Sequence, residues 1–436
     1  MSVENNPVDI EEARRRMAAF ITAYRPAKTV TRLEIKVHPL DMMAWLSAQK
    51  DEIKIYGANQ SDTVSIAGIG QAAVVTGRKI ISYARIFNKL RALLSPQYPY
   101  LQWYGGFCFD ERHQDKDWQE FGAYRFVLPR FELAAQEGRM IFCCNLIGRE
   151  NTKTLLKQLA AVTFSRADKG RNVFSISRRV DKPNQMFWEK GIDRVLTDKS
   201  VRKVVLARKT IFDFKQTLDP WTMLKALKAV TPNSYHFAFQ FKKAVFLGAS
   251  PERLYRRRSR AIESEALAGT MPRFSKPAAL QRSAKNQHEH ALVVDAIQAV
   301  FDKLCITFKQ DKEPGILTLA NGHHLITRFQ GQLKSGVRDE DILECLHPTP
   351  ALGGTPRPAA LALIRKLEGF SRGWYGAPIG YVGLDWAEFV VGIRSGHLSG
   401  GRLSVFAGAG IVQGSQPSAE WNEIENKISN FIKIIR

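Results

Sequence analysis

The stretch EFVVGIRSGHLSGGRLSVFAGAGIV, residues 388–412, gives the clearest indication of the fold. It contains two runs rich in β-branched and aromatic residues, within 386–398 and 402–412, separated by a short gap. Such runs are typical of strands, and strands joined by so short a connection pair as an antiparallel hairpin. The stretch therefore predicts an antiparallel sheet in this part of the chain.

Strands and helices alternate irregularly in the rest of the sequence. Residues 30–150 are rich in strand patterns, a further strand is predicted at 201–212, and helices are predicted at 221–230, 286–304 and 418–435. This order favours a large α+β fold with mostly antiparallel sheets over a regular series of βαβ units. We find no internal repeat and no long linker, so we expect one large domain in which the N-terminal third is an integral layer.

Composition and charge exclude several classes of protein. Of 436 residues, 44% are hydrophobic and 24% charged, which is ordinary for a globular protein. There is no run of 18 apolar residues, and the N-terminus lacks the pattern of a secretory signal, so we expect no membrane insertion. The five cysteines include no CxxC pair, which argues against a disulfide framework or a zinc site and favours the cytoplasm.

The formal net charge of +22 raises the possibility of nucleic-acid binding. The basic residues are mostly dispersed, however, and the densest cluster is RLYRRRSR at 253–260. No nucleic-acid-binding motif accompanies this cluster. We therefore favour a solvated basic surface, which would also attract a small anionic substrate.

Two residues are candidates for acid–base chemistry. In the predicted strand at 201–212, Lys203 shares a face with Val201 and Val205. Such a lysine either extends to solvent or stays desolvated, and a desolvated amine is a usable base near neutral pH. Glu252, in FLGASPERL at 246–254, stands where an apolar strand breaks. It is either a solvated loop residue or a proton donor at the mouth of a pocket.

Carboxylates on two predicted helices are candidates for a metal site. Glu289 begins an otherwise apolar helix face, and Glu420 and Glu423 share a flank of the last helix with Lys427. His288 does not start an HExxH motif, so hydrated Mg²⁺ held by one or two carboxylates fits better than zinc. The alternatives are a solvated glutamate at a helix start and an exposed set of ion pairs.

Glycines and one arginine complete a possible pocket. AGAG at 407–410 and LAGT at 267–270 would allow a small ligand to approach the backbone closely, although neither is a dinucleotide fingerprint or a phosphate loop. Arg394 lies in an apolar predicted strand, where a buried arginine usually holds an anion such as a carboxylate.

These segments, in this order, resemble the chorismate-utilising enzymes, most closely the isochorismate synthases of menaquinone pathways. The segments that carry the resemblance are KVVLAR, FLGASPERL, EALAGT, HPTPALGG, YGAPIGY, FVVGIRSG, AGAGIV and EWNEIENK. They extend from about Lys203 to Lys427, roughly half of the chain, while WYGGFCFD and FVLPRFEL in the first 150 residues match more loosely.

The resemblance implies a single-domain fold of the anthranilate synthase component I type: a two-layer antiparallel β-sheet sandwich flanked by helices. Residues 1–30 would form an N-terminal tail and helix, and residues 31–436 a chorismate-utilising catalytic domain. Within this domain, 31–150 would be the N-terminal layer and 190–436 the motif-rich catalytic part.

The resemblance also implies a reaction and a cofactor. Water adds at C2 of chorismate while the C4 hydroxyl leaves, giving isochorismate. Lys203 matches the base that activates the water, and Glu252 matches the acid that protonates the leaving hydroxyl. Glu289 and Glu423 match the ligands of Mg²⁺, with Glu420 as a nearby supporting carboxylate. The positions that match substrate-binding residues are Gly269, Thr270, His324, Tyr375, Arg394, Gly408, Gly410 and Lys427.

The resemblance leaves some alternatives open. A lysine at position 203 favours water over ammonia as the nucleophile, and we expect no glutaminase subunit and no specific nucleic-acid partner. A monomer or a homodimer is expected. Salicylate synthases, which go on to eliminate pyruvate, and isochorismate synthases of siderophore pathways remain alternatives, although EALAGTMPR and the N-terminal segment favour release of isochorismate.

Overall fold

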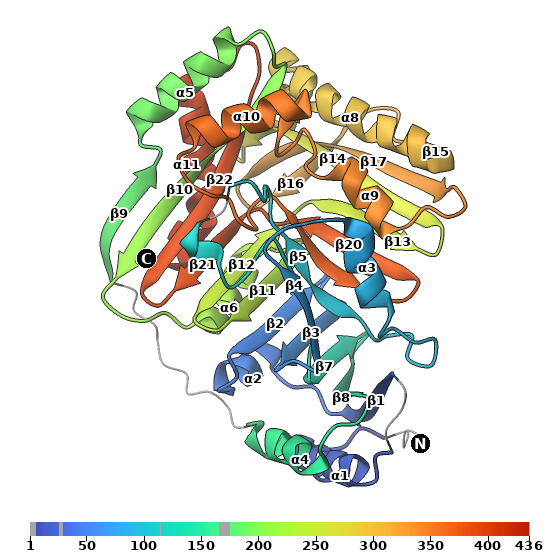
Figure 1. Cartoon of the computed structure of the whole chain (residues 1–436). Coiled ribbons are helices and arrows are strands. Elements are labelled where there is room, and N and C mark those ends of the chain that lie inside the picture. Colours follow the sequence, from blue (N-terminus) through green and yellow to red (C-terminus); the bar gives the residue numbers. More distant parts are fainter. Residues whose placement is uncertain (1–5, 26–28, 114, 165–174, 436) are drawn as a thin grey trace.

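Two large sheets form the body of the protein (Figure 1). The computed structural model describes residues 6–25, 29–113, 115–164 and 175–435, so parts of the N-terminal tail predicted for residues 1–30 lie outside the described residues. The strand pairs near the points where the chain passes from one sheet to the other are antiparallel. This confirms the predicted α+β class with a two-layer antiparallel arrangement.

The larger sheet contains, in spatial order, β1 (Val30–Val37), β8 (Arg139–Ile147), β7 (Phe131–Gln136), β3 (Val64–Ile69), β2 (Ile53–Ala58), β11 (Tyr235–Phe241), β12 (Ala244–Ser250), β21 (Ser395–Ser399), β22 (Arg402–Ile411), β10 (Lys203–Phe214) and β18 (Gly354–Thr355), with β9 (Ile176–Lys182) also paired to β10. The smaller sheet contains β15 (Cys305–Gln310), β17 (Gly322–Leu333), β14 (Ala261–Pro272), β13 (Arg253–Arg258), β20 (Trp386–Val391), β19 (Pro378–Val382), β5 (Trp103–Phe107), β6 (Tyr124–Leu128) and β4 (Ala73–Gly77), with β16 (Gly315–Leu319) paired to β17.

Helices cover the sheets and gather at their ends. The α-helices among the described residues are α1 (Ile10–Thr22), α2 (Met42–Ala48), α3 (Tyr83–Arg91), α4 (Thr152–Ala161), α5 (Gln185–Thr197), α6 (Pro220–Val230), α7 (Pro277–Arg282), α8 (Ala284–Leu304), α9 (Asp339–Leu346), α10 (Arg357–Leu367) and α11 (Pro417–Ile434). Helices α5, α8, α10 and α11 lie at one end of the molecule, and α1 and α4 lie at the opposite end (Figure 1).

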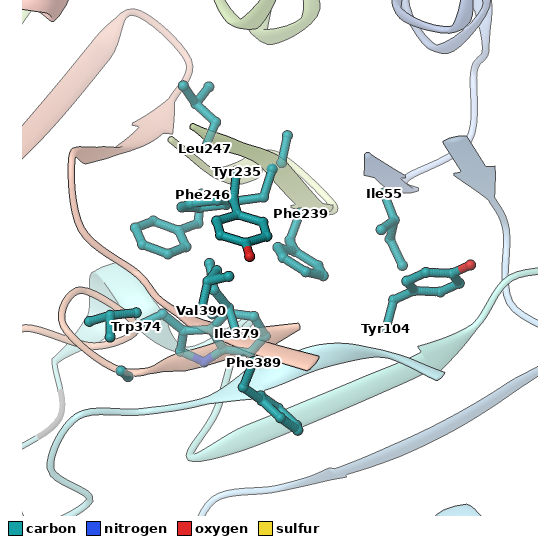
Figure 2. Packing of buried hydrophobic residues seen from close by; sticks show 14 of the residues in the cluster. Ile55, Tyr104, Tyr235, Phe239, Phe246, Leu247, Trp374, Ile379, Phe389 and Val390 are labelled. Carbon is teal, nitrogen blue, oxygen red and sulfur yellow. The ribbon is translucent and has the colours of Figure 1, made fainter. Parts of the chain in front are cut away.

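The N-terminal third contributes strands to both sheets. Strand β2 pairs with β11 in the larger sheet, and β5 pairs with β19 in the smaller one. The side chains between the sheets are large and apolar, and Figure 2 shows Phe239 and Phe246 of the larger sheet facing Ile379 and Val390 of the smaller one. Burial of this apolar surface holds the two layers together.

Two of the places where the chain passes from one sheet to the other lie next to each other. Strand β12 ends in the larger sheet and β13 begins in the smaller one, so Pro251 and Glu252 form one crossing. Residues 392–394 form the other, between β20 and β21. The amide of Val391 donates to the carbonyl of Glu252 at 3.1 Å, and the amide of Ala249 donates to the carbonyl of Arg394 at 3.0 Å. The two crossings therefore lie side by side.

The sequence predicted one continuous strand within 386–398, through Arg394, and this prediction is wrong because the second crossing divides it into β20 and β21. The backbone of Arg394 has φ 50°, in the left-handed region that interrupts a strand. The AGAG and LAGT segments lie inside β22 and β14. As a result, Gly408 and Gly410 share one face of β22, since side chains alternate along a strand.

The basic cluster at 253–260 is largely ion-paired rather than solvated. Arg253 and Arg256 both contact Glu263, and Arg257 pairs with Asp339, with 2.7 Å between Nη2 and Oδ2. Strand β13 lies inside the smaller sheet, between β14 and β20, and the neighbouring elements supply these carboxylates. None of the described helices is long and apolar enough to cross a membrane.

Candidate active site

A pocket of about 640 Å³, part of which is open to solvent, lies where the two crossings meet β10, β14, β17 and β22. Most of the predicted site residues line this pocket. They are Glu252, Gly269, Thr270, Glu289, His324, Tyr375, Arg394, Gly408, Gly410 and Lys427. Lys203 and Glu423 lie outside this lining but form ion pairs with two of its residues, Glu289 and Lys427. Glu420 also lies outside the lining and pairs with Lys285. The sequence therefore identified most of the polar groups of one pocket.

Glu252 has the environment expected of a protonated carboxyl group. The residue is 4% exposed and lines the pocket, and its carboxyl group makes no hydrogen bond or ion pair with the described residues. Burial, and next the nearby negative charge of Glu265, raise the pKa of Glu252 to about 8, against the opposing effect of Lys203 and Lys427. At neutral pH this group is a proton donor rather than a carboxylate.

Lys203 is the first residue of β10 and is fully buried. Its Nζ lies 3.1 Å from Oε1 of Glu289, a contact that is an ion pair rather than a well-aligned hydrogen bond. A Cβ atom at position 410 would lie only 2.1 Å from the same Oε1 and 3.0 Å from Cε of Lys203. Only glycine at position 410 leaves room for both side chains.

The three candidate metal-binding carboxylates are each paired with a different lysine. Glu289 pairs with Lys203, Glu423 with Lys427 at 2.5 Å, and Glu420 with Lys285. Burial alone would raise the pKa of Glu289, but Lys203 and Lys427 lower it below its usual value. Burial, and next Glu423, raise the pKa of Glu420.

These carboxylates fit the chemistry of a magnesium ion without forming a preassembled centre. Among the described residues, no three acidic, histidine or cysteine side chains gather closely enough to hold a metal. Nevertheless, the charges of Glu420, Glu423 and Glu289 all act on Lys285, so the three carboxylates lie near this one lysine. Oxygen donors of this kind suit Mg²⁺, which keeps several waters and needs only one or two carboxylates.

Arg394 presents a positive charge to the pocket without a carboxylate partner among the described residues. Its Nη1 donates to the carbonyl of Lys427 at 3.3 Å, and its Nη2 lies 3.3 Å from Nε2 of His324. Burial lowers the pKa of Arg394 to about 10, so the guanidinium stays charged at neutral pH. A buried guanidinium in strained backbone is suited to hold a substrate carboxylate.

His324 links Arg394 to Thr270. A guanidinium can only donate, so Nε2 of His324 accepts, and its Nδ1 therefore carries the proton and donates to Oγ1 of Thr270 at 3.1 Å. Burial and the charge of Arg394 hold the pKa of His324 well below its usual value. The imidazole is thus neutral, and the hydroxyl proton of Thr270 remains available to a ligand.

The remaining polar residues shape the opposite wall. Nζ of Lys427 donates to the carbonyl of Gly408 at 2.8 Å. A Cβ atom at position 408 would lie 3.1 Å from Oη of Tyr375. Gly269 has φ +77° and lies at an irregularity in the pairing of β14 with β17, which brings Thr270 against Asn286. Glycines 269, 408 and 410 are therefore required by backbone conformation or by close approach.

Two polar residues near the site were not singled out from the sequence. Lys285 stands one helical turn before Glu289, a spacing that could have indicated it. Glu265 is a buried acid in strand β14, two residues before the first residue of the LAGT segment.

The fold consists of stacked antiparallel sheets, and its pocket contains a proton donor, an enclosed lysine and an arginine. These features are those of an enzyme that acts on a small anionic molecule. The chain belongs to the family of chorismate binding enzymes, whose model matches residues 16–436. This confirms the family resemblance seen in the sequence.

Similar proteins include isochorismate synthases. The chain is 33% identical over 353 residues to isochorismate synthase MenF of Bacillus subtilis, covering 76% of this chain and 74% of that protein. It is 34% identical over 350 residues to the salicylate biosynthesis isochorismate synthase of Pseudomonas aeruginosa, covering 74% and 72%. The solved structure of the menaquinone-specific isochorismate synthase MenF of Escherichia coli matches with a TM-score of 0.87 and 27% identity, covering 98% of this chain and 100% of that one.

Proposed function

We propose that the protein is a Mg²⁺-dependent isochorismate synthase that converts chorismate to isochorismate. One observation carries most weight: the buried carboxyl group of Glu252, whose pKa is raised to about 8, lines the pocket, and the fully buried Lys203 pairs with Glu289 of the same lining. The matching relatives carry the name of this activity, which supports the proposal.

The reaction needs a base and an acid that act on different carbons of the ring. Lys203, in its neutral form, takes a proton from the water that attacks C2, so it must first release the proton that its ion pair with Glu289 favours. Glu252 gives its proton to the hydroxyl that leaves C4, so a second water departs. The raised pKa of Glu252 is what an acid of this kind requires at neutral pH, because a carboxylate would have no proton to give.

The substrate carries two carboxylates, and the pocket offers matching cations. Arg394 is free of carboxylate partners among the described residues and can bind one carboxylate through two donors. The hydroxyl group of Thr270, fixed by His324, is placed to donate to an oxygen of the ring substituents. These contacts orient the ring between Lys203 and Glu252.

Glu289 and Glu423 would hold Mg²⁺, with Glu420 in support. When bound, the ion would add positive charge for the second carboxylate of the substrate. The lysines paired with these three glutamates balance their negative charge.

Menaquinone synthesis is the pathway that we propose, because relatives named MenF match along most of the chain. The Pseudomonas aeruginosa relative belongs to salicylate biosynthesis, so a siderophore-type role is the second candidate.

The test is a product analysis. The purified protein is incubated with chorismate and MgCl₂, and the products are separated by liquid chromatography. We expect isochorismate alone, with loss of activity in EDTA and recovery on addition of excess MgCl₂. Salicylate with pyruvate would instead identify a salicylate synthase, and no conversion of chorismate would refute the proposal. The control is Lys203→Ala under the same conditions.

A further inference from the structure

Glu265 is a buried acid that holds the chain beside Glu252. It lies on β14, on the same face as Leu267, which lines the pocket two residues later. The residue is 8% exposed, and its Oε1 accepts a hydrogen bond of 2.7 Å from the amide of Arg253. Arg253 directly follows Glu252 and starts β13.

The main chain on both sides of Glu252 is held by separate elements. The side chain of Gln60, from the turn between β2 and β3, donates to the carbonyl of Pro251 at 3.1 Å. Strand β20 holds the carbonyl of Glu252 through the amide of Val391. Glu265 holds the amide of Arg253. The backbone is thus fixed at three consecutive residues, while the carboxyl group of Glu252 remains free to meet the substrate.

We propose that Glu265 is a positioning residue for the acid Glu252, fixing the crossing between the sheets through the Arg253 amide and placing a second carboxyl group beside the first. This inference rests on the proposed function, because it assigns Glu265 to the proton-donating step. Glu265 itself does not line the pocket and transfers no proton.

Two neighbouring carboxyl groups in a buried site do not both ionise easily, and the surroundings decide which one keeps its proton. Burial raises the pKa of Glu265 above its usual value, although the amide and side chain of Arg253, and then Arg328, oppose this rise. The groups that face Glu252 are Glu265, Lys203, Lys427 and Tyr375.

Glu252 has no donor comparable with the Arg253 amide, because its carboxyl group makes no hydrogen bond with the described residues. Of the two groups, Glu265 therefore ionises first, and Glu252 keeps its proton to higher pH. Removing the charge of Glu265 should lower the pKa of Glu252 and shorten the pH range in which it can act as an acid.

Three variants separate the effects of charge and position. Glu265→Gln removes the charge but keeps an oxygen that can accept from Arg253. Glu265→Asp keeps the charge but is one methylene shorter, so it loses the 2.7 Å contact. Glu263→Gln is the control, because it removes a carboxylate from the same strand that contacts only arginine side chains.

The measurement is the pH dependence of kcat for isochorismate formation, with circular dichroism to show that each variant is folded. In Glu265→Gln the alkaline limb should move to lower pH by about one unit, as expected for loss of a neighbouring like charge. In Glu265→Asp, kcat should fall roughly tenfold with little movement of the limb, as expected for loss of one buried hydrogen bond. Glu263→Gln should leave the limb in place.

An unchanged limb in folded Glu265→Gln, with an active wild-type enzyme, would overturn the inference and leave the proposed function intact. An equal shift in Glu263→Gln would also overturn it, because the effect would then be general electrostatics. A wild-type protein that makes no isochorismate would instead refute the proposed function itself.

Discussion

Replacement of Glu252 by glutamine should remove activity and at the same time stabilise the protein. Burial keeps Glu252 protonated in the folded state, whereas the same group ionises freely in the unfolded chain. The folded state therefore binds one more proton than the unfolded state between the two pKa values. Stability is lost through this group as the pH rises from about 4.5 to about 8. Glutamine resembles the protonated group and never ionises, so it avoids this loss.

The size of the stabilisation by Glu252→Gln follows from the shift in the pKa of Glu252. The pKa of Glu252 rises from 4.5 to about 8. At pH 7 the unfolded chain gains about 3 kcal/mol by ionising this one group, at about 1.4 kcal/mol for each pH unit above 4.5. For a chain of 436 residues this corresponds to a rise in Tm on the order of 3 °C in Glu252→Gln. At pH 5 the same rule gives only about 0.7 kcal/mol, so the difference in Tm should be below about 1 °C.

The assay is thermal unfolding of the wild-type protein and Glu252→Gln, followed by circular dichroism at pH 5, 6, 7 and 7.5. The difference in Tm should grow steadily with pH, while isochorismate formation by the variant is lost. A difference that is the same at every pH, or a wild-type protein that is the more stable one at pH 7, would refute the reasoning. Glu263→Gln is the control, because its carboxylate is partly exposed and paired with arginines.

Two further predictions concern the base and the glycine beside it. Lys203→Ala should lower kcat at least about 100-fold, because the proposed reaction then lacks the base that takes the proton from water. Steady-state kinetics at pH 7.5 check this prediction, and activity near that of the wild type would exclude the assigned role. Gly410→Ala should raise KM for chorismate and weaken activation by MgCl₂, because the added methyl group would displace Glu289 from its position near Lys203. Gly191→Ala is its control, since the methyl group there meets only Leu206 at 3.7 Å, and an equal effect of both substitutions would contradict the argument.

Local patterns in the sequence predicted the class of fold, whereas most of the pocket lining was predicted from the resemblance to the chorismate-utilising enzymes. The two adjacent strand patterns within 388–412 indicated antiparallel pairing. In the last predicted helix, Ile424, Ile428 and Phe431 recur at helical spacing, and the structure buries all three in α11. Both depend on residues close in the sequence.

The sequence could not place the breaks that create the site. Arg394 adopts a left-handed backbone that few arginines adopt, and the surrounding contacts of the two sheets impose it. The apolar residues around it therefore predicted a continuous strand. The contact of Glu265 with Arg253 was also hidden, because it joins two strands across a turn and leaves no periodic signal. The lysine partners of the three candidate metal-binding glutamates depend on tertiary packing in the same way.

The most direct test of the central claim follows the oxygen atom of the attacking water. The protein is incubated with chorismate and MgCl₂ in water enriched in ¹⁸O, and the isochorismate is analysed by mass spectrometry. Addition of water at C2 with loss of the C4 hydroxyl predicts one ¹⁸O atom in each product molecule, on the C2 hydroxyl. Isochorismate without the label would show that the hydroxyl moves within the substrate, and would contradict the assignment of Lys203 and Glu252 as base and acid.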